Sequence, residues 1–217
     1  MLSGAAVTAA GIALNGCQKA GLVREPVTPY FGPRHGPGPY AEASQRAGGS
    51  RPPSEPTQVA RASSGGLWTP PGPERAWRYI VLHHSATDHG SADVFDRLHR
   101  SAGWDELGYH FVIGNGTESG NGAVEIGSRW PKQKHGAHCK VSSHPEYNDV
   151  GIGVCLVGNF DQSRPSDAQV AACVRLVQFL KDRYGVPESR IYGHGQLKPT
   201  HCPGALFPYN EVFRGLT

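Results

Sequence analysis

A proline- and glycine-rich stretch, residues 21–73, most limits what this chain can fold into. It contains eleven of the eighteen prolines, and its segment GPRHGPGPYAEASQRAGGSRPPSEPT has almost no aliphatic side chains. Such a segment cannot bury enough apolar surface to offset the entropy lost on ordering. We therefore expect residues 21–73 to form a disordered, partly polyproline linker. The remaining residues, 74–217, have the length of one compact domain.

The first residues, 1–20, differ in kind from the linker. They are short, apolar and rich in small side chains, and they include Leu14-Asn15-Gly16-Cys17. This arrangement resembles a signal peptide followed by a bacterial lipobox, although no Lys or Arg precedes the apolar run and Asn15 is unusual there. A plain secretory signal and an alanine-rich tail without a role are the alternatives. We expect an exported protein of the cell envelope, periplasmic or membrane-anchored, with a candidate lipid anchor at Cys17.

Composition excludes several other classes of protein. The net charge of +3 is modest, and the Lys and Arg residues are scattered rather than gathered into patches interleaved with aromatic residues, so we expect no nucleic-acid partner. No stretch is long and apolar enough to span a bilayer. Cys155 and Cys173 lie among apolar residues and read as small buried side chains, so the cysteines give no disulfide framework. We expect a monomer.

Hydrophobic periodicity predicts alternating strands and helices after residue 74. Ser91 and Ser166 are predicted helix N-caps, and Ser166 with Gln169 forms a capping-box pattern. The predicted strands are 79–84, 109–114, 122–127, 151–157 and 190–194, and the predicted helices are 91–101 and 166–184. Residues 128–149 show no clean period and are expected to form a long loop. The pattern predicts a single layered α/β domain with a central mixed sheet flanked by helices.

Two adjacent histidines, His83 and His84, end the first predicted strand. Side chains alternate along a strand, so one ring must face each side of the sheet. A second His and a Cys, His194 and Cys202, lie eight residues apart in YGHGQLKPTHCPG. Two imidazoles and a thiolate would leave the fourth position of a zinc ion open for water, as in catalytic sites. The residues alone leave a second cluster open, formed by His135, His138 and Cys139.

Four segments carry a resemblance to a known family. VLHHSAT, ELGYHFVIGNG, YNDVGIGVCLVGNF and GHGQLKPTHCPG stand in the order found in the zinc-dependent N-acetylmuramoyl-L-alanine amidases. That family includes phage endolysin amidases, bacterial cell-wall amidases and the peptidoglycan recognition proteins. The resemblance covers residues 79–204 and leaves the N-terminal segments outside.

The resemblance implies a role for particular residues. The implied zinc ligands are His83, His194 and Cys202; the implied catalytic residues are Tyr109 and Thr200; His138 and Asn148 are implied to lie near the substrate cleft. Thr200 stands where many phage enzymes carry a catalytic lysine, and Lys198 is a neighbouring alternative. His84 is expected to give hydrogen-bonded support on the opposite face of the sheet.

The resemblance also implies a reaction, the zinc-dependent hydrolysis of the amide between N-acetylmuramic acid and L-alanine in peptidoglycan or muropeptides. The implied cofactor is Zn²⁺, and residues 128–149 are the expected wall of a substrate groove. Two alternatives belong to other classes. One is a non-catalytic peptidoglycan-binding module of the same fold, which loss of Cys202 or Tyr109 would favour. The other uses Cys202 as a thiolate nucleophile, and a chelator would leave that activity intact.

Overall fold

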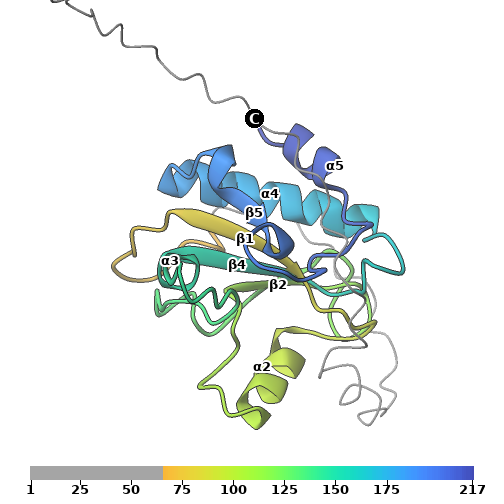
Figure 1. Ribbon diagram of the computed structural model, residues 1–217, viewed down its shortest axis with the longest axis horizontal. Helices are drawn as coiled ribbons and strands as arrows, with labels where there is room; N and C mark the ends of the chain where they lie inside the picture. The colour runs from red at the N-terminus through yellow and green to blue at the C-terminus, as the bar shows by residue number, and fades with distance from the viewer. Residues whose placement is uncertain (1–65) are drawn as a thin grey trace, which may run out of the picture.

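A single five-stranded sheet forms the centre of the computed structural model, which describes residues 66–217. The strand order is β3-β2-β4-β1-β5, and Figure 1 labels the last four of these strands. Strands β1, β2, β4 and β5 run parallel, and β3 is antiparallel to β2. The strands are β1 (Tyr79–His84), β2 (Phe111–Ile113), β3 (Val124–Ile126), β4 (Gly151–Leu156) and β5 (Ile191–Gly193). The signal-like segment 1–20 and linker residues 21–65 lie outside the described residues.

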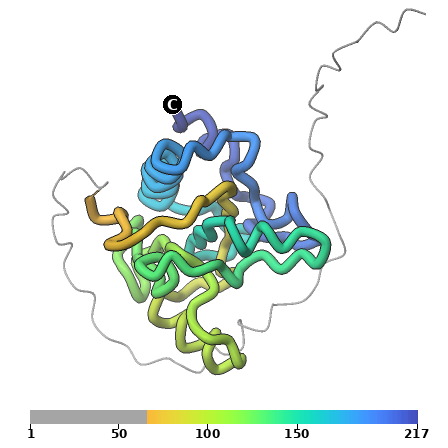
Figure 2. Tube along the Cα trace, turned by 90° about the vertical axis from the view of Figure 1, so that its left-hand side faces the viewer, coloured from red at the N-terminus to blue at the C-terminus, as the bar shows by residue number. Residues whose placement is uncertain are grey.

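Helices lie on both sides of this sheet. The longest, α4, and the C-terminal α5 lie on one side, and α2 lies on the other (Figures 1 and 2). The α-helices are α2 (Ala92–Ser101), α3 (Glu146–Asp149), α4 (Asp167–Tyr184) and α5 (Tyr209–Arg214), with 3₁₀ turns η1 (Glu188–Arg190) and η2 (His194–Gln196). The predicted α/β class with a central mixed sheet flanked by helices is confirmed.

The inner strands β1 and β4 are buried along nearly their whole length because helices and loops cover both faces. On one face, Ile80, Leu82 and Val154 share a core with Leu176 and Leu180 of α4. On the other face, Val112 and Cys155 pack with Phe95 of α2 in a smaller cluster. This second face also carries His83, because His83 of β1 pairs with Cys155 of β4 and paired residues on neighbouring strands point to the same face.

Most predicted elements occur where the sequence places them. The predicted strand 79–84 matches β1, and α4 begins at the predicted capping box and ends at Gly185, whose φ of 62° is the left-handed conformation typical of a helix end. Two differences are local. Chain residues 114–123 form a longer connection between β2 and β3 than the predicted turn at Asn115-Gly116. The predicted loop 128–149 ends in the single helical turn α3.

The last residues of the predicted linker contact the domain. Residues 66–73 belong to the predicted linker, yet Trp68 is only 6% exposed and its carbonyl accepts a hydrogen bond from Nε1 of Trp130 at 2.8 Å. The Trp68 ring also packs edge-on against Phe179 of α4. One large aromatic side chain is enough to anchor a segment that otherwise has a linker composition. Within residues 66–217, no helix is long and apolar enough to cross a membrane.

Candidate metal centre

The ends of two parallel strands bring the first two candidate ligands together. His83 is the penultimate residue of β1, and His194 follows directly after Gly193, the last residue of β5. Because Leu82 pairs with Gly193 in parallel register, the next residue of each strand lies at the same edge of the sheet. The two imidazole rings lie 4.6 Å apart between centroids, and the His83 side chain is 1% exposed.

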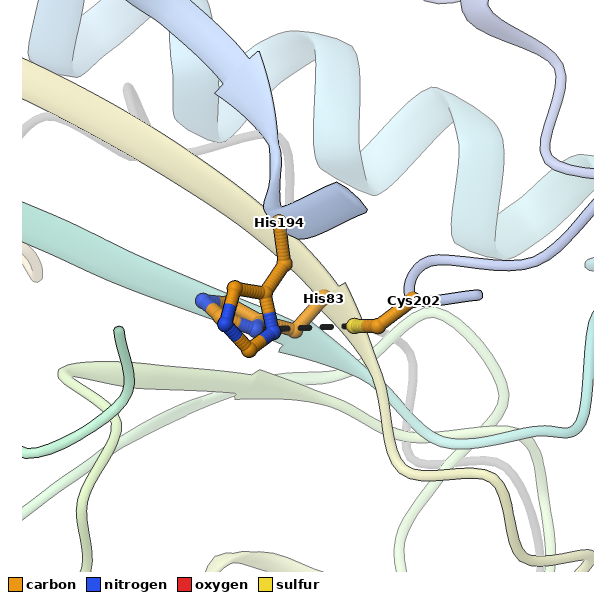
Figure 3. Close-up of side chains that lie close together, drawn as sticks. All are labelled: His83, His194 and Cys202. Carbon is orange, nitrogen blue, oxygen red and sulfur yellow. Dashed lines mark hydrogen bonds between the residues drawn. The ribbon is translucent and has the colours of Figure 1, made fainter. Parts of the chain in front are cut away.

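Cys202 approaches the same point from the loop that follows η2 (Figure 3). Its Sγ lies 3.5 Å from Nδ1 of His83 and accepts a hydrogen bond from the backbone N–H of His84 at 3.4 Å. The N–H of Gly195 donates to the carbonyl of Cys202, and a Cβ on Gly195 would lie 2.6 Å from the carbonyl oxygen of Thr200. Glycine at 195 thus lets the loop fold back closely enough to present the thiol.

These three side chains fit a zinc ion. One ligand atom from each of His83, His194 and Cys202 lies within 4.8 Å of the others, and ligands of a tetrahedral zinc stand about 3.3–3.8 Å apart. Nε2 of His194 is also buried without a hydrogen-bond partner, and it is the single such side-chain atom in residues 66–217. A buried polar atom of this kind requires an explanation, and a bound ion beside it supplies one.

The rival cluster does not converge in the structure. His135 is exposed, whereas His138 and Cys139 are buried, and among the described residues only the His83 set gathers three ligand atoms. The choice that the sequence left open between the two clusters is therefore decided by the path of the chain after η2, which places Cys202 beside β1.

Burial sets the protonation of the three candidate ligands. It lowers the pKa of His83 well below 6.5 and that of His194 to about 3, so both rings are neutral at neutral pH. Burial raises the pKa of the Cys202 thiol to about 12, against a smaller opposite effect of the His84 N–H. Neutral imidazoles are ready ligands, whereas a metal ion must displace the proton of the thiol in order to bind.

Tyr109 and Thr200 both lie beside this cluster. Tyr109 precedes β2 by two residues, is partly buried, and has its ring centroid 5.2 Å from that of His83. It lines a small recess together with Ser85, Phe95 and His99. Oγ1 of Thr200 accepts a hydrogen bond from the backbone N–H of Cys202 at 3.4 Å. Lys198, the alternative to Thr200, donates to the backbone carbonyl of Lys140 at 3.5 Å.

The two predicted substrate-binding residues have protein partners. His138 is 8% exposed, and its Nδ1 lies 3.1 Å from Nε2 of His83. Oδ1 of Asn148 accepts hydrogen bonds from the backbone N–H groups of His138 and Cys139 at 2.9 and 2.8 Å. Asn148 thus holds the chain segment that presents His138. Contact of either residue with a substrate stays a prediction.

His84 points to the opposite face of the sheet, as expected from strand alternation. Its Nδ1 accepts a hydrogen bond from the backbone N–H of Phe160 at 3.1 Å, and its ring is 7% exposed. Burial lowers its pKa to about 4. His84 therefore supports the loop after β4 and contributes its backbone N–H, rather than its ring, to the Cys202 sulfur.

A buried arginine, missed in the sequence, fixes the segments on both sides of the site. The Arg129 side chain is fully buried; Nε donates to the carbonyl of Leu107 and Nη1 to that of His135, while Nη2 pairs with Asp105. Leu107 lies two residues before Tyr109, and His135 lies three before His138. One guanidinium thus ties together the chain segments that carry two site residues. No spacing in the sequence points to it.

Comparisons with known proteins agree with this arrangement. A family model for N-acetylmuramoyl-L-alanine amidase (Amidase_2) matches residues 73–205. The chain is 31% identical over 144 residues to peptidoglycan-recognition protein SC2 of Drosophila melanogaster, a match covering 62% of this chain and 71% of that protein. It is 37% identical over 108 residues to N-acetylmuramoyl-L-alanine amidase of Sus scrofa, covering 48% of this chain and 16% of that protein.

A solved structure shares the fold. N-acetylmuramoyl-L-alanine amidase LysC from Clostridium intestinale URNW superposes with a TM-score of 0.55 at 24% sequence identity, covering 69% of this chain and 95% of that one. At this level of identity the likeness concerns the fold alone. The family match spans more than half of the chain, and it includes all three candidate ligands and Tyr109. The chain therefore belongs to the N-acetylmuramoyl-L-alanine amidase family.

Proposed function

We propose that this protein is a zinc-dependent amidase that hydrolyses the bond between the lactyl group of N-acetylmuramic acid and the L-alanine of the peptidoglycan stem peptide. The observation that carries the proposal is the convergence of His83, His194 and Cys202, from three separate segments, on ligand atoms within 4.8 Å of one another. The family match over residues 73–205 supplies the substrate class.

Three ligand side chains suit catalysis better than a structural role. Two neutral imidazoles and one thiolate leave one position of a tetrahedral ion for water or substrate, whereas structural sites are closed by four protein ligands. A bound zinc ion would supply a Lewis acid and a water of lowered pKa at this place. His83, His194 and Cys202 would hold it, and the N–H of His84 donates to the Cys202 sulfur and so stabilises its thiolate form.

Tyr109 is the candidate for stabilising the charge that develops on the amide oxygen. Its ring lies beside His83, and the residue lines the small recess together with Ser85, Phe95 and His99. A phenolic O–H donates one hydrogen bond to an oxygen that becomes negative in the transition state. Thr200 would assist from the Cys202 loop with its hydroxyl, which already accepts the long bond from the Cys202 N–H.

A non-catalytic peptidoglycan-binding module is the second candidate. It is favoured by the similarity to peptidoglycan-recognition protein SC2, whose name describes recognition. Against it stand the retained Cys202 and Tyr109, since a pure binding module needs neither a metal ligand nor an oxyanion donor. The two candidates share the substrate class and differ in whether a covalent bond is broken.

Mass spectrometry of purified peptidoglycan fragments separates these candidates. After incubation with the protein, the amidase predicts stem peptides with a free N-terminal L-alanine and glycan chains that keep their muramic acid. A chelator should abolish this release, and added zinc should restore it. Unchanged fragments that nevertheless bind the protein would favour the binding module, and release that persists in chelator would favour a Cys202 nucleophile.

Export stays a proposal that rests on the sequence of residues 1–20. We propose that the protein reaches the cell envelope, where peptidoglycan is found, and that Cys17 is its lipid anchor. If residues 21–73 form the linker expected from their composition, its roughly fifty residues would reach on the order of 40 Å from such an anchor. Fractionation of cells expressing the full chain and a Cys17→Ser variant tests this, since equal amounts in the soluble fraction would contradict an anchor.

A further inference from the structure

We infer that His138 is a positioning residue that fixes the tautomer of His83, so that Nδ1 of His83 faces the metal position without a proton. The expected effect on zinc binding rests on the proposed function, whereas the hydrogen bonds do not. The arrangement itself is a chain of two hydrogen bonds that runs from the backbone of β4 through His138 to His83.

The first bond decides where the proton of His138 lies. Nε2 of His138 lies 3.1 Å from the carbonyl oxygen of Gly151, the first residue of β4. A carbonyl oxygen only accepts hydrogen bonds, so Nε2 of His138 must carry the hydrogen. In a neutral ring the other nitrogen, Nδ1, is then an acceptor.

The second hydrogen bond determines which nitrogen of His83 carries the hydrogen. Nδ1 of His138 lies 3.1 Å from Nε2 of His83. Because Nδ1 of His138 is the acceptor of this hydrogen bond, Nε2 of His83 must donate it. With its hydrogen on Nε2, the neutral His83 ring has a bare Nδ1. That atom is the one 3.5 Å from the Cys202 sulfur, on the side where the three ligand atoms converge. The opposite tautomer would place a hydrogen where the ion must bind.

Two glycines leave the space that the His138 ring occupies in this orientation. A Cβ on Gly136 and a Cβ on Gly153 would each lie 2.4 Å from Cδ2 of His138, closer than any non-bonded carbon contact. Gly153 sits inside the buried strand β4, opposite Val81 of β1, where glycine is otherwise unfavourable. Its presence is explained by the ring that lies flat against the sheet at this point.

Neighbouring groups do not compete for the nitrogens of His138. The imidazole of His110 lies 5.8 Å away between ring centroids. Its Nδ1 accepts from the N–H of Gly153 at 2.9 Å, and its Nε2 donates to the carbonyl of Lys134 at 3.0 Å. The two nitrogens of His138 therefore bond to the Gly151 carbonyl and to His83, and we call this pair of hydrogen bonds the relay.

A matched pair of variants tests the relay. An Asn side chain places its amide oxygen near the position of Nδ1, so His138→Asn keeps an acceptor for His83. A Gln side chain reaches the position of Nε2 instead, so His138→Gln keeps the contact with Gly151 and loses the acceptor. We expect His138→Gln to bind zinc about 10- to 100-fold more weakly than the parent protein, and His138→Asn to retain most of the affinity. Competition with a chromophoric chelator measures both.

Nitrogen NMR of the metal-free protein reads the tautomer directly. With Cys202→Ala as the background, no thiol contacts Nδ1 of His83, and we expect the His83 ring to carry its hydrogen on Nε2. Adding His138→Gln should give a mixture of tautomers, and adding His138→Asn should not. Gly153→Ala forces a Cβ against the His138 ring and should also give a mixture of tautomers. It replaces His138→Gln in this measurement if His138→Gln does not fold.

The outcomes separate this inference from the proposed function. Identical His83 tautomers in all these proteins, or a parent protein with the hydrogen on Nδ1, would overturn the relay. A parent protein that binds no zinc but shows the Nε2 tautomer, lost in His138→Gln, would support the relay and contradict the zinc site. Thermal unfolding of each variant shows that it is folded before its spectrum is interpreted.

Discussion

Replacing any one of the three converging side chains should leave the protein without bound zinc and without amidase activity. His83→Ala, His194→Ala and Cys202→Ala each leave two ligands, and two protein ligands do not retain a tetrahedral zinc ion against water and buffer. The loss of activity is expected to be complete within the detection limit, because the ion's chemistry has no substitute among the neighbouring side chains. Metal analysis by plasma mass spectrometry measures the zinc content of each purified variant.

The chain offers a matched control for these variants. His201 is an exposed histidine directly before Cys202; its Nδ1 lies 3.7 Å from a carboxylate oxygen of Asp161, and it is not one of the three converging ligands. His201→Ala removes an imidazole from the same loop, and we expect the parent zinc content and rate. Unchanged zinc content in all three ligand variants would refute the assigned site.

Tyr109→Phe should keep the zinc and lose most of the rate. The Phe ring preserves the packing beside His83, so fold and metal are retained, whereas the hydroxyl that would stabilise the developing oxyanion is removed. Loss of one such donor lowers kcat by about 100- to 1,000-fold in other enzymes. Release of stem peptide measured at saturating substrate gives kcat, and zinc analysis of the same sample checks the metal.

Thr200→Ala provides a comparison within the same site. Its Oγ1 already accepts a hydrogen bond from the N–H of Cys202, at a long distance of 3.4 Å, and we expect a smaller loss than for Tyr109→Phe. Parent-like hydrolysis by Tyr109→Phe would show that the tyrosine only packs. A loss of zinc in that variant would show instead that the ring holds the ligand His83 in place.

Short sequence patterns predicted the strands and helices that are set by interactions between residues close in the sequence. The apolar run that ends in His83 and His84 became β1, and the capping box of Ser166 and Gln169 opens α4. Strand alternation also placed the two histidine rings on opposite faces, as the separate partners Cys202 and Phe160 confirm. These signals act over a few residues, so they are readable without the fold.

Other features depend on contacts that no local pattern encodes. The role of His138 follows from a loop that lays its ring on β4, and the loop itself has no periodicity. One signal was present, because Gly153 interrupts a buried strand and a glycine there indicates close approach of another group. Trp68 was likewise hidden by the linker composition around it, since a single anchoring aromatic residue hardly changes the average of its segment.

We propose that one zinc ion makes this protein a hydrolase and that His83, His194 and Cys202, whose ligand atoms converge, hold it. Titration of the metal-free protein with zinc, with the release of L-alanine-terminated stem peptide measured at each point, tests it most directly. The predicted result is no release without zinc, a linear rise, and saturation at one zinc per chain. Full release by the metal-free protein, or no release at any zinc concentration, would contradict it.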